Sequence, residues 1–535
     1  MKPPKNKLTA GEKKKIISTI EVITGKFDVE SICAYGSRIS GYAKPESDYD
    51  LIISIRNYTP KVRYRYISDS IDVSAILVNS KSLLSDAKNA SLGDFVAGRF
   101  LNPYETIAGG EIFNEIEYIY KKRVALETIN ELISEYQNFT EDLIIPVEYL
   151  LFERLRKRAS LYPPALYSYA KTYGRSVGKE NLRRSCETFI SALEELDREE
   201  EMINLEGRVL RLGGSRRNQL GKIQTAISVT QRGIRHYAVH GYAGRVRPSI
   251  VRKELFAKMS RARGSTDIPN ELKYPKSLLS IEDGVLMIED ERWINRFLEN
   301  IGLRDADVVT KRVGGSTTLF TIAKDGMEKQ FLAKKFRSTE SMRQIVSSIA
   351  KTSKVFEFTP LSRLHKEYSS TRLLNGKGID VAKIRAVILP QRIIVRDFVS
   401  GQNLSVIVKD RSQRRNTVNM ELLPLRSYGQ ILAKIHVLGF ALGDPKPTNA
   451  ISSEKDGRIF LTDLESMIVG GDPFLDLSVF LQNTIGSNIK SETSRMIVRS
   501  ILDGYLEDVK PEKLEEMLRS KYLLPFRENI SHFIE

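Results

Sequence analysis

The chain has 535 residues, which is too long for one hydrophobic core and predicts three or four domains. It is 41% hydrophobic and 28% charged, as globular proteins are, and its two cysteines exclude a disulfide framework or a cysteine metal site. The formal charge of +16 favours polyanionic partners such as nucleotides or nucleic acid. No apolar run approaches the ~20 residues of a membrane span and no cleavable signal is evident, so we expect a cytoplasmic protein with no membrane partner.

The most informative stretch follows a helix predicted over 13–24. One apolar run ends at Gly36-Ser37, and a second begins around Asp48 and Asp50. These two aspartates are two residues apart at a strand start, so their side chains point to the same face. Carboxylates this close repel each other unless a cation lies between them, and Mg²⁺ takes such ligands together with nucleotide phosphate. Gly36 lets the backbone approach a phosphate, and Ser37 offers a hydroxyl and an amide.

A third apolar run carries Asp72 near its start, although Asp69 lies close enough to be confused with it. A third carboxylate could complete a site for two metal ions, one activating a hydroxyl and one holding a triphosphate. Residues 10–120 thus resemble the DNA polymerase beta-type nucleotidyltransferase superfamily. The resemblance rests on Gly36, Ser37, Asp48, Asp50 and Asp72. It implies transfer of NMP from an NTP, with the aspartates as catalytic metal ligands and the Gly-Ser pair on the nucleotide.

Tyrosine, arginine and lysine interleave over residues 56–69. Such a mixture suits stacking on bases and pairing with phosphates, and it equally suits an edge strand with solvated charges. The sequence leaves both interpretations open. Helices are expected over 80–120, closing a first domain of residues 1–122.

Helical patterns continue over 141–161, 163–174 and 178–203, and residues 204–213 predict two short strands joined by a tight turn. This order resembles a winged helix-turn-helix within a predicted domain of residues 123–240, whose third helix could enter a nucleic-acid groove. Positive charge favours nucleic-acid contact, while a packing module is the alternative. The candidate contacts are Lys179, Arg183, Arg184 and Arg208.

Another helix is predicted over 219–237, followed by a basic linker over 241–300 with a short helix at 253–261. A basic run of this kind is usually a solvated segment. Binding to an RNA or DNA backbone is the sharper alternative.

The chain changes character again in a final predicted domain, residues 301–535. A glycine turn, Gly314-Gly315-Ser316, separates two predicted strands. A third strand carries Lys334 toward one face and Lys335 toward the other.

A helical segment follows and contains Glu367, for which Glu357 is an alternative in the same role. A further helix leads into a loop in which Asp444 and Asn449 are five residues apart, with Lys446 between them. A short strand then leads into Asp463-Leu464-Glu465.

These motifs resemble the atypical protein-kinase-like fold, with two lobes, over about residues 300–535. The similar families are the Rio and tRNA-modification kinases and the lipopolysaccharide and aminoglycoside kinases. The resemblance implies ATP and Mg²⁺ as cofactors. It assigns the role of general base to Asp444 and the binding of Mg²⁺ to Asn449 and Asp463. It assigns nucleotide contacts to Gly314, Gly315 and Ser316 of the turn and to Lys334, Glu367 and Lys446. It also matches Asp476 to a buried structural aspartate.

Two positions depart from the family pattern. Leu442 stands where histidine is usual, and the glycine turn lacks the full Gly-x-Gly-x-x-Gly. The alternative for this part of the chain is an inactive kinase-like scaffold.

The sequence therefore predicts an α/β multidomain protein: a nucleotidyltransferase mixed sheet, a helical winged-helix-like middle and a kinase-like end. The expected function is bifunctional nucleotidyl and phosphoryl transfer, with a protein or RNA acceptor left open. One alternative is a regulatory nucleic-acid-binding protein whose catalytic folds act as nucleotide sensors. Another is modification of one half of the chain by the other.

Overall fold

The chain folds into two compact units, Met1–Glu282 and Asp283–Glu535, each of which is described by itself. Both combine helices with sheets, so the protein is a mixed α/β multidomain chain. No helix among the described residues is long and apolar enough to cross a membrane. The helices expected over 219–237 and 253–261 fall outside the described residues. The computed structural model describes residues 7–136, 139–200, 203–212, 268–282, 284–288, 293–337, 359–413, 422–486, 491–507 and 511–531.

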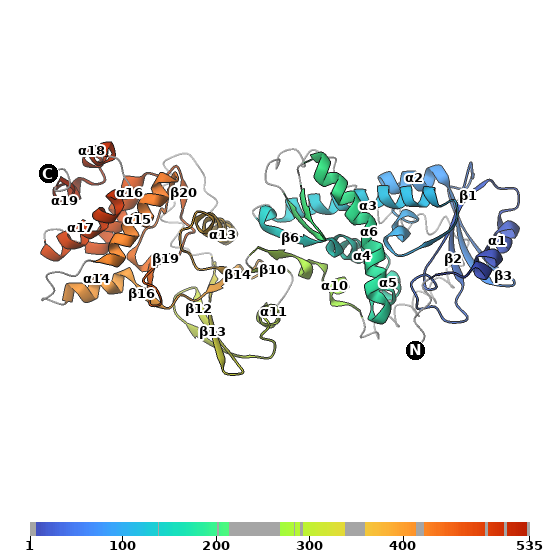
Figure 1. The fold of residues 1–535 in the computed structure, drawn as a ribbon, viewed down its shortest axis with the longest axis horizontal. Helices are drawn as coiled ribbons and strands as arrows, with labels where there is room; N and C mark the ends of the chain where they lie inside the picture. The colour runs from blue at the N-terminus through green and yellow to red at the C-terminus, as the bar shows by residue number, and fades with distance from the viewer. Residues whose placement is uncertain are drawn as a thin grey trace. The chain divides into compact units, whose positions relative to one another are not determined.

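The first unit opens with a five-stranded sheet in the order β3-β4-β2-β1-β5 (Figure 1). Strands β2 and β4 run parallel, and the other neighbours are antiparallel, which makes the sheet mixed as predicted. The strand β5 was missed, because only helices were expected in that part of the chain. The strands are β1 (Val29–Tyr35), β2 (Tyr49–Ile55), β3 (Val62–Ser68), β4 (Asp72–Asn79) and β5 (Glu105–Ala108).

One face of this sheet is a hydrophobic core closed by helix α1 (Ala10–Thr24). Ile16 and Ile20 of the helix are buried with Leu51 of β2 and Val73 of β4. Because side chains alternate along a strand, the residues between these apolar positions face the other way. Asp48, Asp50 and Asp72 occupy those other positions.

Helices α2 (Ser80–Asn89) and α3 (Gly110–Tyr136) contact the opposite side of the sheet from α1 (Figure 1). Helix α3 runs without interruption through position 122, where the sequence suggested the end of the first domain. Its buried positions keep the helical spacing from Phe113 to Leu132, so the chain has no break there.

Three helices and a two-stranded hairpin follow, in the order expected from the sequence. The prediction of helix over 141–146 was wrong, because Leu143–Pro146 forms strand β6 and pairs with β8. Pro146 explains the difference, since it has extended backbone angles and offers no N–H, so helix α4 begins only after it. The elements are α4 (Val147–Leu161), α5 (Ala165–Tyr173), α6 (Arg175–Glu200), β7 (Ile203–Glu206) and β8 (Val209–Leu212). Three further short elements end this unit: α10 (Asn270–Lys273), η4 (Pro275–Leu278) and β9 (Ser280–Ile281).

The larger sheet of the second unit has its strands in the order β11-β12-β13-β15-β14-β10. Helix α11 (Trp293–Asn300) packs on it through Trp293 against Phe320 and through Phe297 against Phe331. This corrects the prediction of a linker up to residue 300, because the two aromatic residues share one buried helix face. The strands are β10 (Gly284–Met287), β11 (Asp307–Arg312), β12 (Thr317–Lys324), β13 (Met327–Lys335), β14 (Ile384–Ile388) and β15 (Ile393–Asp397).

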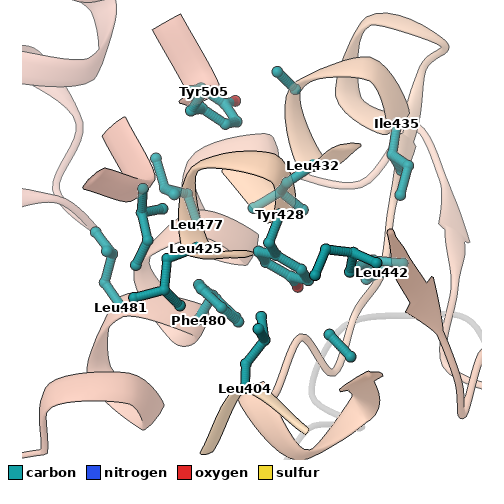
Figure 2. Close-up of a cluster of buried hydrophobic side chains, with 14 of the residues drawn as sticks. Leu404, Leu425, Tyr428, Leu432, Ile435, Leu442, Leu477, Phe480, Leu481 and Tyr505 are labelled. Atoms are coloured by element: carbon teal, nitrogen blue, oxygen red, sulfur yellow. The ribbon is translucent and has the colours of Figure 1, made fainter. Parts of the chain in front are cut away.

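The rest of the second unit is mostly helical. Its core includes Tyr428 stacked on Phe480, with ring centroids 4.0 Å apart, and Leu442 packs in the same cluster (Figure 2). The helices are α13 (Pro360–Gly376), α14 (Leu404–Gln413), α15 (Leu423–Val437), α16 (Pro473–Ile485), α17 (Glu492–Leu506), α18 (Pro511–Arg519) and α19 (Arg527–Ser531). Short strands connect them: β16 (Gly401–Asn403), β17 (Phe440–Ala441), β18 (Ala450–Ser453), β19 (Ile459–Leu461) and β20 (Ile468–Val469).

Candidate functional sites

The three aspartates of the first unit lie on one face of the sheet. In the parallel pairing of β2 with β4, Asp50 is opposite Ser74 and Tyr49 is opposite Val73. The position before the Tyr49–Val73 pair carries Asp48 on one strand and Asp72 on the other. The structure thus places on one sheet face the carboxylates that the spacing singled out. Asp69 lies instead in the exposed turn before β4.

Gly36 is required by the position of Asp50. Its φ is +78°, and a Cβ placed on it would lie 2.1 Å from Oδ2 of Asp50. The Asp50 carboxylate therefore covers the glycine at the end of β1. Ser37 begins a tight turn in which its carbonyl accepts a hydrogen bond from the amide of Tyr42 at 3.1 Å. The turn and the aspartates consequently lie at the same end of strands β1, β2 and β4.

In this structure Asp48, Asp50 and Asp72 are not arranged as a closed metal site. In the parts of the chain that the structure describes, one other group of three carboxylates has its oxygens within 4.8 Å of one another. The exposed phenol of Tyr66 lies near Asp48 and Asp72, and its pKa is raised by partial desolvation and then by these two charges. Carboxylate oxygens fit Mg²⁺ by their chemistry, but here the side chains would have to move together to share an ion.

The tyrosine- and arginine-rich segment 56–69 contains β3, which is an edge strand of the sheet. Tyr64 and Tyr66 face the side of the aspartates, while Arg65 is exposed and pairs in register with the core residue Ala75. The edge-strand interpretation is therefore correct in its geometry. Contact of the tyrosines with bases stays a prediction.

The candidate nucleic-acid residues of the first unit are mostly engaged with neighbouring groups. Arg183 is exposed and forms ion pairs with Glu180 and Glu187, and Arg208 pairs with Glu148 at 2.6 Å. Arg184 donates to the backbone carbonyl of Tyr104 at 3.0 Å, and Lys179 is exposed. Asn181, which lies between Lys179 and Arg183 on α6, is fully buried. Its side chain donates to the carbonyls of Ser40 and Thr172. The start of α6 is thus partly an internal packing surface.

The second unit contains a buried ion cluster centred on Lys334 of β13. The Lys334 ammonium lies 2.6 Å from Asp463 and 3.3 Å from Glu367, which belongs to α13. It also lies 3.3 Å from Glu465. Lys334 is 7% exposed, whereas Lys335 is exposed, so the predicted alternation is confirmed. Glu357, the alternative to Glu367, lies outside the described residues.

Charge pairing outweighs burial in this cluster. Burial lowers the pKa of Lys334, but Glu367, Asp463 and Glu465 raise it above its usual value. Burial likewise raises the pKa of Asp463, but Lys334 and two nearby arginines lower it on balance. Asp463 has a φ of +60°, a conformation that a residue with a side chain rarely adopts without a compensating gain. The ion pair with Lys334 supplies such a gain.

The loop before β18 brings Asp444, Lys446 and Asn449 together. The Lys446 ammonium lies 2.7 Å from Oδ2 of Asp444. The Asn449 side chain donates to the Asp444 carbonyl at 3.2 Å. The Asn449 carbonyl accepts from the amide of Thr462 at 2.8 Å, which ties this loop to the residue before Asp463.

Asp476 fixes the backbone just before Asp444. This aspartate is 3% exposed and accepts hydrogen bonds from the amides of Leu442 at 2.6 Å and Gly443 at 2.8 Å. Its other neighbour, His436, also contacts the hydroxyl of Tyr505 at 2.7 Å. A leucine is accommodated at 442 because its backbone serves Asp476 while its side chain fills the core (Figure 2).

The glycine turn joins β11 and β12. The Ser316 carbonyl accepts from the amide of Lys335 at 2.8 Å, so the turn is attached to the strand that carries Lys334. A Cβ on Gly315 would meet nothing within 4 Å, and one on Gly314 would meet only Thr317 at 3.8 Å. The folded chain itself therefore does not require glycine at either position.

Sequence reasoning missed three charged members of the Lys334 cluster. Arg396 of β15 lies 3.0 Å from Glu367, and Arg363 of α13 lies 2.5 Å from Glu465. Glu465 follows Asp463 by two residues, which was a local signal for a shared role. The arginines gave no such signal, because their partners lie far away in the sequence.

The group Glu367, Asp463 and Glu465 is the one whose oxygens lie within 4.8 Å of one another. Lys334 already contacts all three carboxylates, so its ammonium occupies the position between them that a metal cation would take. The carboxylate of Asp463 and the side-chain amide of Asn449 nearby offer oxygen atoms of the kind Mg²⁺ prefers. The donor chemistry therefore fits a magnesium ion shared by these two residues.

No protein-family model and no curated protein matches this chain. Among solved structures, "WaaP in complex with acyl carrier protein" is similar with 14% identity and a TM-score of 0.28, over 46% of this chain and 98% of that one. The PknI kinase domain of Mycobacterium tuberculosis is similar with 13% identity and a TM-score of 0.26, over 42% and 95%. Scores this low do not establish a shared fold.

Proposed function

We propose that the chain is a transferase with two nucleotide sites, and that its second unit transfers the γ-phosphate of ATP to a hydroxyl. The observation that carries this proposal is the contact of Lys334 with Glu367 and Asp463, which come from a strand, a helix and a loop. Kinases hold the phosphates of ATP with a strand lysine that is oriented by a helix acid. A lysine buried among three carboxylates matches that arrangement.

The loop residues supply the remaining steps. Asp444 accepts the proton of the acceptor hydroxyl as its oxygen bonds to the γ-phosphorus, and the bond from that phosphorus to ADP breaks. Lys446, held 2.7 Å from Asp444, is suited to contact the transferred phosphate. Asn449 and Asp463 would hold Mg²⁺, which neutralises charge on the phosphates when it is bound.

For the first unit we propose nucleotidyl transfer from an NTP. The observation favouring it is the set Asp48, Asp50 and Asp72 on one sheet face, with the Asp50 carboxylate seated over Gly36. Three carboxylates at the edge of a sheet are suited to hold Mg²⁺ and a triphosphate. The acceptor is a hydroxyl of a protein, an RNA or a small molecule.

The test is incubation of the full chain with Mg²⁺ and ATP labelled separately at the α and γ phosphates. We expect γ-label on an acceptor to be lost in Asp444→Asn by roughly 10²–10⁴-fold, the usual value of a general base. We expect α-label to be lost in Asp50→Asn. Each variant is the control for the other site. Unchanged γ-label in Asp444→Asn, or unchanged α-label in Asp50→Asn, would sink the corresponding half.

The competing proposal is a nucleic-acid-binding regulator that uses both sites as nucleotide sensors. It would gain support if neither label were transferred while tight ATP binding persisted. It also requires binding to duplex DNA that weakens with salt and is lost on substitution of Arg183 and Arg184. The ion pairs of Arg183 with acids of its own helix weigh against it.

A further inference from the structure

Arg99 of the first unit has an unusual set of partners for an arginine inside a protein. It lies in the short helix η1 (Ala97–Leu101) and donates to the hydroxyls of Tyr35 at 3.1 Å and Tyr64 at 2.7 Å. Its third hydrogen bond goes to the carbonyl of Phe95 at 3.1 Å. Across the described part of the chain, no carboxylate lies within 4.0 Å of its guanidinium. A cation removed from water without an anionic partner is costly, so the arrangement requires an explanation.

The segment that carries Arg99 is held firmly from both sides. The buried carboxylate of Asp86 accepts hydrogen bonds from four amides of the segment 92–97 at 2.9 to 3.1 Å. Arg158 donates to the carbonyl of Asp94 at 2.5 Å. It also lies so close to Gly98 that a Cβ there would be 1.8 Å from its guanidinium. The backbone that carries Arg99 is therefore fixed, so the Arg99 guanidinium is in position before a ligand binds. This is the property expected of a preorganised binding group.

Both phenols that hold Arg99 lie on the aspartate face of the sheet. Tyr35 is directly opposite Asp50 in the pairing of β1 with β2. Tyr64 is opposite Ile76 on β4, two positions along the same face from Ser74. The phenols that hold the cation therefore share one sheet face with the aspartates, and Tyr35 is the direct cross-strand neighbour of Asp50.

The chemistry of this group suits a phosphate. A phenol that accepts a hydrogen bond from arginine still has its own O–H to donate, so Tyr35 can add a donor beside the guanidinium. A planar guanidinium binds two oxygens of a phosphate at once, which is stronger than a neutral contact. The aspartates repel such an anion, so a nearby fixed cation is needed to hold it.

We propose that Arg99, with the hydroxyl of Tyr35, binds a phosphate of the substrate beside Asp50. The site takes a polyphosphate, as the triphosphate of an NTP, and a single phosphate on the acceptor is the other source of the same chemistry. The identity of the substrate rests on the proposed nucleotidyl transfer. The presence of an anion site does not.

The experiment is calorimetric titration of the full chain in EDTA with inorganic tripolyphosphate and, separately, with orthophosphate. We expect Arg99→Met to weaken tripolyphosphate binding at one site by tenfold or more. The matched control is Arg65→Met, an exposed arginine of β3 on the opposite face, which should change binding by less than twofold. Binding to the second unit contributes equally to both variants, so the difference isolates the first unit.

A larger loss for tripolyphosphate than for orthophosphate identifies the triphosphate as the source, and equal losses identify a single phosphate. Tyr35→Phe removes one hydroxyl and provides a second test if Arg99→Met does not fold. We expect it to weaken binding threefold or more. Binding within twofold of wild type in Arg99→Met, or in Tyr35→Phe if Arg99→Met does not fold, would overturn the proposal.

One further variant separates this site from the proposed reaction. Asp50→Asn removes a negative charge beside Tyr35, which holds Arg99, so in EDTA it should strengthen tripolyphosphate binding while nucleotidyl transfer is lost. If no transfer is ever observed and binding still depends on Arg99, the anion site stands and nucleotidyl transfer fails. If Asp50→Asn weakens binding in EDTA, the placement of the phosphate beside Asp50 is wrong.

Discussion

The two candidate sites carry similar charges but balance them in opposite ways. In the second unit Lys334 contacts three carboxylates, two of which also pair with arginines, so cations and anions match within the folded chain. In the first unit Asp48, Asp50 and Asp72 share a face, while the nearby cation Arg99 contacts phenols and a carbonyl. One site is assembled by its own ion pairs. In the other, the cation Arg99 is held by two phenols and a carbonyl instead of by carboxylates.

The largest effect should come from breaking the balanced cluster. Lys334→Met keeps the length of the side chain but leaves buried carboxylates without their central cation. Removing one partner of a buried ion pair costs ~3–5 kcal/mol, so we expect a loss of this size in the stability of the second unit, together with loss of γ-phosphate transfer. Chemical denaturation of the variant, with hydrogen exchange in α13 as the readout for the second unit, measures the loss of stability.

Lys335→Met is the matched control, because the neighbouring lysine is exposed and should change stability by only about 0.5 kcal/mol. Equal stability of the two variants would mean that the three carboxylates do not depend on Lys334. The second unit would then resemble the first, and the contrast between the sites would disappear.

A second test disturbs the unbalanced site through its geometry. Gly36→Ala places a methyl group 2.1 Å from the Asp50 carboxylate at a backbone φ of +78°. Gly207→Ala is the control, because Gly207 has a φ of +64° and nothing within 4 Å of its Cβ position. Both variants strain the backbone, so the difference between them reports the clash.

We expect Gly36→Ala to unfold about 1–3 kcal/mol more easily than Gly207→Ala, which is typical of overpacking, and to lose α-phosphate transfer. Thermal unfolding and the labelled-ATP assay measure the two effects. If the two alanine variants behave alike, Asp50 moves freely away from Gly36, and the carboxylate is not fixed at this edge.

The third test uses pH on the balanced cluster. The pKa of Asp463 is lowered from 3.8, so its contribution to stability is present above pH 3.8 and is lost as the pH falls through the lowered value. The pKa of Lys334 is raised from 10.5, so its contribution is present below pH 10.5 and is lost as the pH rises through the raised value. The cluster should therefore stabilise the second unit evenly between these limits.

Comparison of wild type with Asp463→Asn over this range measures that contribution. The stability difference should be constant between pH 3.8 and pH 10.5 and should shrink outside these limits. Asp410→Asn, at an exposed position of α14, controls for a change of surface charge. A difference between wild type and Asp463→Asn that keeps its size at acid pH would show that the ion pair contributes nothing.

Local spacing predicted the groups that each site contains, and it failed where distant segments meet. The alternation of Lys334 and Lys335 and the shared face of Asp48 and Asp50 follow from the pleat of a strand, which is a local property. The pairing of Arg396 with Glu367 follows from tertiary packing, which no residue spacing records. Arg99 was missed for the same reason, because its phenol partners lie 64 and 35 residues away.

The fold shows the same limit. Strand β6 was mistaken for the start of a helix because its apolar residues fit both patterns, and its partners β8 and β9 lie far along the chain. Residues 293–300 were assigned to a linker because basic residues dominate the stretch before them. The burial of Trp293 against Phe320 depends on a sheet that forms later in the sequence. In each case a long-range contact decided between two locally acceptable structures.

The smallest expected effect concerns Mg²⁺ without nucleotide. In the first unit the ion would relieve repulsion among Asp48, Asp50 and Asp72, so it should slow hydrogen exchange in β2 and β4 severalfold. The strand β13 should be unaffected, because Lys334, Arg363 and Arg396 together already neutralise the three acids of that cluster. Asp72→Asn should abolish the protection. Asp69→Asn, in the exposed turn three residues earlier, should keep it. Equal protection of both units by Mg²⁺ would mean that the second site also awaits a cation, and that the difference between the two sites lies only in their ligands.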